Sequence, residues 1–296
     1  MPISLISKLH STPLAFLDVE TTGASAEFGD RVIEIGIARV ENAQLIAQFD
    51  QLIDPTRRIS PGVVALTGIT NDMVAGQPTF DELLPRIAEL LKDCVIIGHN
   101  IRFDLSFLHC EFRRARVPFI ETFGPTHVLD TLRIARRRFG RGGNGLQILS
   151  RRLGITPPAA HRALADSLTT HQVFQALVEP LGGFNCDLCD VIADQGGPMG
   201  LLPASPREPL LPLELIEALE QHGLVQMDYI DGRDNRTQRI IKPLDIRRRK
   251  GELVLVAHCH LRNDRRTFKL ERIVHLNRID SATPDPATCA RVLGIT

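Results

Sequence analysis

The chain has no tryptophan, one tyrosine and no long apolar run. Among its 296 residues Tyr229 is the single tyrosine. A helix that crosses a membrane needs about 20 consecutive apolar residues, and no segment offers them, so no membrane partner is predicted. The first residues hold one lysine and no apolar core, which argues against a secretory signal. We therefore expect a globular protein of the cytoplasm.

The cysteines give no disulfide framework. Six are scattered along the chain, and a reducing cytoplasm is the setting that this favours. Cys186 and Cys189 form one CxxC, but a structural zinc site needs a second pair of ligands, and none follows nearby. A redox pair would need a strand-to-helix context that the surrounding residues lack. We interpret these thiols as lying at the edge of a linker, with a ligand role as the alternative.

An acidic pair ends the first apolar run. The segment 13–20 reads as a short buried strand, in which Asp18 and Glu20 point to the same face. A lone pair of this kind is also typical of a solvated strand face. In a buried setting, two like charges this close are unfavourable unless cations lie between them. Oxygen-only ligands favour Mg²⁺ or Mn²⁺ over zinc.

Two further acids and a histidine complete the pattern. Asp104 begins an amphipathic helix just after the apolar run 95–97, so it lies at the rim where the first strand also ends. His161 precedes Asp166 by five residues, at the mouth of a helix that runs to about Val178. Separately, Asp104 reads as a charge favoured by the helix dipole and His161 as a surface cap. Their joint occurrence with the strand acids indicates chemistry.

With these motifs, residues 12–178 resemble the DnaQ-like exonucleases of the DEDDh type, the family of the proofreading epsilon subunit of bacterial DNA polymerase III. Asp18 and Glu20 match the first motif, Asp104 the second, and His161 with Asp166 the third. The resemblance implies an α/β, ribonuclease-H-like fold with a mixed five-stranded sheet flanked by helices. It also implies hydrolysis of nucleic acid from the 3′ end.

The resemblance further implies the roles of these residues. The four acids would hold two Mg²⁺ or Mn²⁺ ions, and His161 would take the proton from the attacking water. Further positions of the family pattern are expected to bind substrate. They are Thr21, Thr22, Gly23, Leu66, Asn100, Phe103 and Phe107.

Arginine is concentrated between the second and third motifs. From Arg113 to Arg152 there are ten arginines, two acids and no lysine. The planar guanidinium binds phosphate oxygens in pairs, so this stretch is a candidate border of the substrate groove. A solvated helix face is the alternative.

Composition changes after Val178. Residues 181–212 are rich in glycine and proline, which predicts a linker. A helix is expected over 213–222, followed by short alternating runs joined by tight turns. This arrangement predicts a small, bent antiparallel sheet or partial barrel.

Residues 213–283 resemble the WYL domain, a small Sm-like β module, although Leu253–Leu255 stands where that family has Trp-Tyr-Leu. The match rests on Tyr229, Pro243 and the segments 266–268 and 272–273. The resemblance implies binding of nucleic acid or a nucleotide-type ligand. The candidate contacts are Arg239, Arg266 and Arg272, with Tyr229 and Phe268 as stacking partners.

Together these features predict a metal-dependent 3′–5′ exonuclease acting on single-stranded or frayed DNA ends, in repair, with a C-terminal nucleic-acid-binding module. An RNA-directed exoribonuclease is one alternative, because the room for a 2′-hydroxyl cannot be read from sequence. The other is a regulator that keeps the nuclease fold as scaffold, and the five intact motif residues argue against it. The sequence identifies no protein partner and no recognisable polymerase-binding segment.

Overall fold

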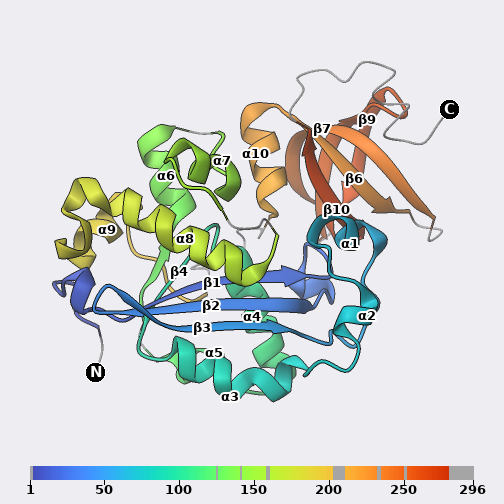
Figure 1. Ribbon diagram of the computed structural model, residues 1–296. Coiled ribbons are helices and arrows are strands. Elements are labelled where there is room, and N and C mark those ends of the chain that lie inside the picture. The colour runs from blue at the N-terminus through green and yellow to red at the C-terminus, as the bar shows by residue number, and fades with distance from the viewer. Residues whose placement is uncertain are drawn as a thin grey trace.

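Two five-stranded sheets organise the chain. The computed structural model describes residues 3–124, 126–140, 142–157, 161–202, 211–231, 235–249 and 252–279. One sheet has the strand order β3-β2-β1-β4-β5 and the other β10-β6-β7-β8-β9 (Figure 1). The predicted class is confirmed: a mixed sheet flanked by helices is followed by an antiparallel β domain.

The first sheet places the strand ends together. β1 pairs antiparallel with β2 and parallel with β4, and β4 pairs parallel with β5. Because β1, β4 and β5 run the same way, their carboxyl ends share one edge of the sheet. The strands are β1 (Leu14–Thr21), β2 (Val32–Glu41), β3 (Gln44–Leu52), β4 (Val95–Gly98) and β5 (Val128–Asp130).

Helices cover both faces of this sheet (Figure 1). One apolar core lies between the sheet and α3, α4 and α5, and a second lies between the sheet and α6 to α9. Short helices α1 and α2 follow β3 and have a small core of their own. The bounds are α1 (Pro61–Thr67), α2 (Asn71–Val74), α3 (Phe80–Leu91), α4 (Arg102–Arg114), α5 (Phe119–Phe123), α6 (Thr131–Phe139), α7 (Leu146–Arg152), α8 (Ala163–Val178) and α9 (Leu188–Asp194).

Much of the expected linker is instead part of the nuclease domain. After α8, single 3-10 turns at Glu179–Leu181 and Gly183–Asn185 lead into α9, which buries Leu188 and Val191 in the second core. Gln195 accepts a hydrogen bond from the Asp130 N–H and donates one to the Val128 carbonyl, so it satisfies the free edge of β5. The linker prediction was therefore wrong for 181–202, and residues 203–210 lie outside the described part.

The CxxC thiols share this extension. Cys186 is buried in the core and Cys189 is partly exposed, and both are free thiols. The carbonyl of Cys186 accepts a hydrogen bond from Leu9 N–H, which ties the N-terminal segment to the extension. The thiols lie in a packed part of the domain and not at the edge of a linker.

The second sheet is antiparallel throughout and carries α10 (Leu213–Gln221). Its core gathers Leu215 and Ala218 of the helix with Met227, Ile241 and Leu255 of the strands. The strand register shifts just after Pro243, where a bulge accommodates the missing N–H. The strands are β6 (Leu224–Ile230), β7 (Arg236–Arg249), β8 (Glu252–Cys259), β9 (Asp264–Lys269) and β10 (Ile273–Ile279).

The second domain packs beside the carboxyl edge of the first sheet (Figure 1). β10 contacts α1, and α10 approaches the loop before α7 so closely that a Cβ on Gly142 would lie 2.8 Å from Gln221. In the part of the chain that the structure describes, no helix has the length and apolar character needed to cross a membrane.

The close contact between β2 and α8 gives a first prediction. A Cβ on Gly36 would lie 2.2 Å from backbone atoms of Ala163 and Leu164, so Gly36→Ala must push the start of α8 outward. We expect the free energy of unfolding to fall by about 1–3 kcal/mol, the usual cost of overpacking. Urea denaturation followed by circular dichroism measures it. Gly200→Ala is the control, since its nearest neighbour would be at 3.7 Å, and equal stability of the two variants would contradict the prediction.

Candidate active site

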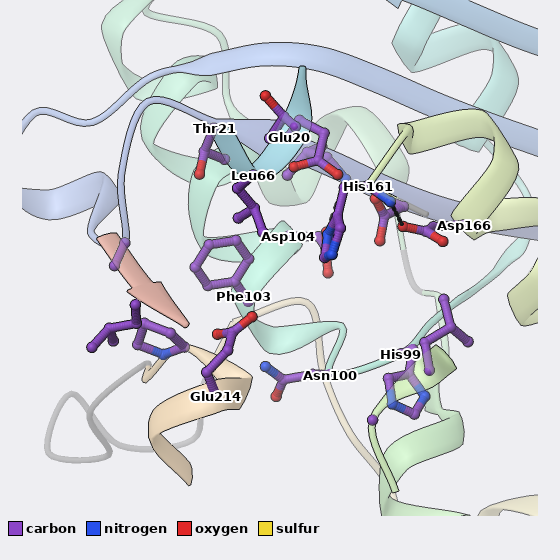
Figure 2. A pocket seen from close by; sticks show the side chains of 18 of the residues that line it. Glu20, Thr21, Leu66, His99, Asn100, Phe103, Asp104, His161, Asp166 and Glu214 are labelled. Atoms are coloured by element: carbon purple, nitrogen blue, oxygen red, sulfur yellow. Dashed lines mark hydrogen bonds between the residues drawn. The ribbon is translucent and has the colours of Figure 1, made fainter. Parts of the chain in front are cut away.

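Four acids from three elements converge on one cavity. Asp18 and Glu20 come from the end of β1, Asp104 from the first turn of α4 and Asp166 from the first turn of α8. All four line a cavity of about 450 Å³, which His161 also lines (Figure 2). The structure thus brings together all five residues that the sequence motifs predicted.

Hydrogen bonds fix two of the acids. The Val19 N–H donates to Asp104 Oδ1 at 3.0 Å, which locks α4 to the strand between Asp18 and Glu20. Gln147 Nε2 donates to Asp166 Oδ1 at 2.9 Å, and the His161 N–H donates to Asp166 Oδ2 at 3.0 Å. Hydrogen bonds from neighbouring groups therefore orient the carboxylates of Asp104 and Asp166.

All four acids of the cavity have a raised pKa, and no basic side chain pairs with them among the described residues. Burial, followed by the neighbouring acids, raises the pKa of Asp18 and Glu20 well above the usual carboxyl range. Burial also raises the pKa of Asp104 well above that range and the pKa of Asp166 to about 6. None of the salt bridges found among the described residues includes any of the four.

The donor set fits divalent metal ions. Ligand atoms of Glu20, His161 and Asp166 all lie within 4.8 Å of one another. Asp18 and Asp104 add carboxylate oxygens on the same cavity, and hard oxygen ligands are those that Mg²⁺ and Mn²⁺ prefer. Burial, and at Asp18 and Glu20 also the neighbouring acids, disfavours the ionised carboxylates, and a bound cation would offset both effects, so the site and the group match.

His161 has an unusual backbone. Its φ is +58°, in the left-handed region that few non-glycine residues adopt. The hydrogen bond from its own N–H to Asp166 holds it there, and strain of this kind is common at functional sites. The structure ties the His161 backbone to the Asp166 carboxylate, and burial lowers the pKa of the imidazole.

An ion pair between a buried carboxylate and a partly exposed arginine, which no sequence motif marked, supports His161. Glu34 on β2 is fully buried and lies opposite Glu20 in the strand register. Its carboxylate accepts from Arg162 Nη2 at 2.6 Å and from the Ala163 N–H at 2.9 Å. Arg162, which follows His161, and Ala163, the first residue of α8, are thereby fastened to β2. The signal was present, because Glu34 interrupts the apolar run 32–37 of a central strand.

Asp130 plays a similar part at the other side of the cavity. It is buried, and its Oδ1 accepts from the N–H groups of Asn100 at 3.0 Å and Leu132 at 2.9 Å. It thus caps α6 and fixes the turn at Asn100, whose φ is +65°, just before α4 delivers Asp104. The sequence analysis did not single out Asp130 or Gln147.

The expected substrate contacts divide into two groups. Five line the cavity, and two do not: Thr22 is buried and donates to Asp30, and Phe107 is fully buried. Phe107 packs its ring 4.9 Å from that of Phe103, so it supports the cavity wall from behind and offers no open face to a base. The lining residues are Thr21, Gly23, Leu66, Asn100 and Phe103.

The candidate contacts of the C-terminal domain lie elsewhere. Phe268 is only 4% exposed, so the stacking role predicted for it is wrong: its ring packs against Tyr229 at 5.1 Å and beneath the Arg239 guanidinium. Arg266 is exposed and Arg272 partly so, and neither lines the cavity. The described arginines of the stretch 113–152 also do not line it, which favours the solvated-face alternative.

The same domain nevertheless reaches the cavity through other residues. Glu214 and Glu217 of α10 and Leu276 of β10 are part of its lining, and Figure 2 shows the Glu214 side chain pointing into it. Burial raises the pKa of Glu214, and the nearby Glu217 adds to the rise. No local sequence pattern marked these residues, because their role depends on how the two domains pack.

Two known families match the chain. Residues 15–174 match the family RNase_T, described as Exonuclease, and residues 213–278 match the WYL domain. A Mycobacterium tuberculosis protein whose name describes it as a bifunctional exonuclease/endonuclease is 36% identical over 182 residues, which are 59% of this chain and 28% of that protein. A Staphylococcus aureus DNA polymerase III PolC-type is 32% identical over 176 residues, 58% of this chain and 12% of the polymerase. The chain thus spans less than a third of these relatives.

Solved structures agree on the fold. The E. coli ExoI–ssDNA complex aligns with 97% of this chain and 68% of its own at a TM-score of 0.54 and 18% identity. The nuclease domain of 3′hExo, a DEDDh family member bound to rAMP, aligns with 61% of this chain and 98% of its own at a TM-score of 0.51 and 17% identity. At such identities the likeness concerns the fold alone.

The Glu34–Arg162 pair gives a second prediction. Glu34→Gln keeps the shape of the side chain but removes the charge that fastens Arg162, so the His161 segment shifts. Because small misplacements of catalytic groups cost up to about 100-fold in rate, we expect nuclease turnover to fall at least about tenfold with KM little changed. Steady-state kinetics measure both quantities.

Glu41→Gln is the matched control. Glu41 also lies on β2 and pairs with Arg39 at 2.8 Å, but it is absent from the cavity lining. Turnover of Glu34→Gln within twofold of that of Glu41→Gln would refute the positioning role. A melting temperature measured for both variants separates loss of positioning from loss of folding.

Proposed function

Because the chain belongs to the Exonuclease family RNase_T, we propose that it removes nucleotides one at a time from the 3′ end of DNA, with two Mg²⁺ or Mn²⁺ ions as cofactors. The observation that carries this proposal is the convergence of Asp18, Glu20, Asp104, Asp166 and His161 on one cavity. A scaffold without activity has no need to gather four acids in one cavity, where burial and neighbouring charge disfavour their ionised forms.

The acids and the histidine have separate tasks. Asp18, Glu20, Asp104 and Asp166 would hold the ions, which when bound neutralise the phosphate and favour ionisation of water. His161 accepts the proton of the attacking water. Burial lowers the pKa of His161, so the imidazole is neutral and able to accept a proton at neutral pH. Asp166 accepts a hydrogen bond from the His161 N–H and so holds the His161 backbone in place during this transfer.

The rest of the cavity suits a single terminal nucleotide. Its volume of about 450 Å³ is at the lower end of the range of about 300–1,000 Å³ typical for small-ligand pockets. Leu66 and Phe103 offer apolar surface for a base, while Thr21 and Asn100 offer polar groups for the sugar. An unpaired 3′ end can deliver its last base to such a pocket, whereas a paired base must first be unstacked.

DNA is the proposed substrate, and RNA is the alternative. The polymerase among the relatives supports DNA. The 3′hExo domain bound to rAMP has the same fold, so the fold by itself does not exclude RNA. With DNA as the substrate, the proposal includes a role in DNA repair and a place in the cytoplasm. In the C-terminal domain, exposed Arg266 is the candidate for a non-specific phosphate contact.

A degradation assay gives the third prediction. With Mn²⁺ or Mg²⁺, 5′-labelled single-stranded DNA should shorten in single-nucleotide steps, EDTA should stop the reaction, and Asp18→Ala should abolish it. We expect His161→Ala to lose about 10²- to 10⁴-fold in rate, the usual contribution of a general base, while substrate affinity stays near that of the wild type.

Matched RNA in the same assay decides between the two substrates. If RNA is degraded faster than DNA, RNA becomes the proposed substrate and the proposed mechanism is unchanged. If His161→Ala retained more than about a third of the wild-type rate, the histidine would not be the general base. Metal-independent shortening, or cleavage by Asp18→Ala, would contradict the proposed function itself.

A further inference from the structure

The C-terminal domain forms one wall of the catalytic cavity. The other wall belongs to β1, α4 and the segment that carries His161. Five residues of the second domain or its approach face them across the cavity. They are Pro212, Glu214, Glu217, Leu276 and Asn277.

This wall is anchored on both sides of the cavity. On one side β10 contacts α1, which carries Leu66. Next to this contact a small pocket is lined by Ala24 of the first domain and by Leu253 and Ile273 of the second. On the other side α10 packs on the loop before α7, where a Cβ on Gly145 would lie 3.2 Å from Glu217. The second domain therefore contacts the nuclease domain on both sides of the cavity.

Glu214 is the charged group that this wall directs at the substrate. Its side chain points into the cavity whose lining also includes Phe103 and Asn100, and Figure 2 shows it on the side opposite Glu20 and Asp166. It is close enough to Glu20 to raise the pKa of that carboxyl. A base that stacks on Phe103 would therefore present its edge to Glu214.

A carboxylate at this place selects among chemical groups. It repels phosphate and accepts hydrogen bonds from N–H groups. Adenine and cytosine offer an amino group on the pairing edge, and guanine offers two adjacent N–H donors. Thymine offers a single N–H between two carbonyl oxygens, which repel a carboxylate.

On the premise of the exonuclease function above, we propose that Glu214 is a specificity-determining residue that accepts a hydrogen bond from the amino-bearing edge of the terminal base stacked on Phe103. The second domain then takes a direct part in substrate choice. The enzyme removes 3′-terminal guanine, adenine and cytosine in preference to thymine.

Glu214 also has a purely structural explanation. It lies in the first turn of α10, where a negative charge is favoured by the helix dipole. That role would affect the stability of α10 and would leave the ratio of rates between terminal bases unchanged. The base ratio is thus the readout that separates the two roles.

The test uses four single-stranded DNAs that differ only in the 3′-terminal nucleotide. The rate of the first cleavage is measured under single-turnover conditions for wild type, Glu214→Ala and Glu214→Gln. One good polar contact to a base edge discriminates by at least about fivefold, so the wild type should favour guanine over thymine by about that factor. Glu214→Ala should bring the ratio near one, and Glu214→Gln, which can also donate, should raise the thymine rate.

Asp264→Asn is the control for charge, because Asp264 is an exposed acid of the same domain and does not line the cavity. It should keep the wild-type ratio. Fluorescence anisotropy with the same four DNAs and Asp18→Ala, with and without Glu214→Ala, measures the preference without cleavage.

The outcomes are distinct. No terminal-base preference in the wild type, or a preference that survives Glu214→Ala, overturns the role of Glu214 even if degradation proceeds from the 3′ end. Absence of metal-dependent cleavage overturns the proposed function, and the anisotropy arm then still decides whether Glu214 selects the base.

Discussion

The crowding of four carboxylates in one cavity, two of them buried and two half-buried, is the constraint on which the rest of the structure depends. Asp18, Glu20, Asp104 and Asp166 each have a raised pKa, with burial as the first cause. A chain that gathers such groups loses folding stability unless cations bind there, and natural proteins accept that loss at functional sites. These four carboxylates are the groups that we propose to hold the metal ions.

The surrounding scaffold counters this crowding at fixed points. The Val19 N–H holds Asp104, Gln147 holds Asp166, and the Glu34–Arg162 pair fastens the start of α8 to β2. Gly36 allows that helix to approach the strand at backbone distance. In the proposed function, pre-organisation of this kind reduces the rearrangement that binding of metal and substrate requires. The second domain then closes the remaining side and adds Glu214.

The sequence predicted the convergence of Asp18, Glu20 and Asp104 because the parallel strands β1 and β4 end at one edge of the sheet. Asp166 and His161 joined that prediction through the family resemblance. The sequence analysis missed Glu34, whose importance depends on a partner 128 residues away. It missed Glu214 because domain packing leaves no local pattern. The linker prediction failed for 181–202 since glycine content hid the contact of Gln195 with β5. The stacking role predicted for Phe268 failed for a related reason, because an alternating strand pattern did not reveal that its ring faces the core.

Thermal unfolding in the presence and absence of Mn²⁺ tests the central claim most directly. If the four acids form a metal site under mutual repulsion, Mn²⁺ should raise the melting temperature of the wild type, because it binds the folded state alone. Asp18→Asn should melt higher than the metal-free wild type, since one repelling charge is gone, and should respond far less to Mn²⁺. A wild-type melting temperature that is indifferent to millimolar Mn²⁺, or an Asp18→Asn variant that melts lower without metal, would contradict the account.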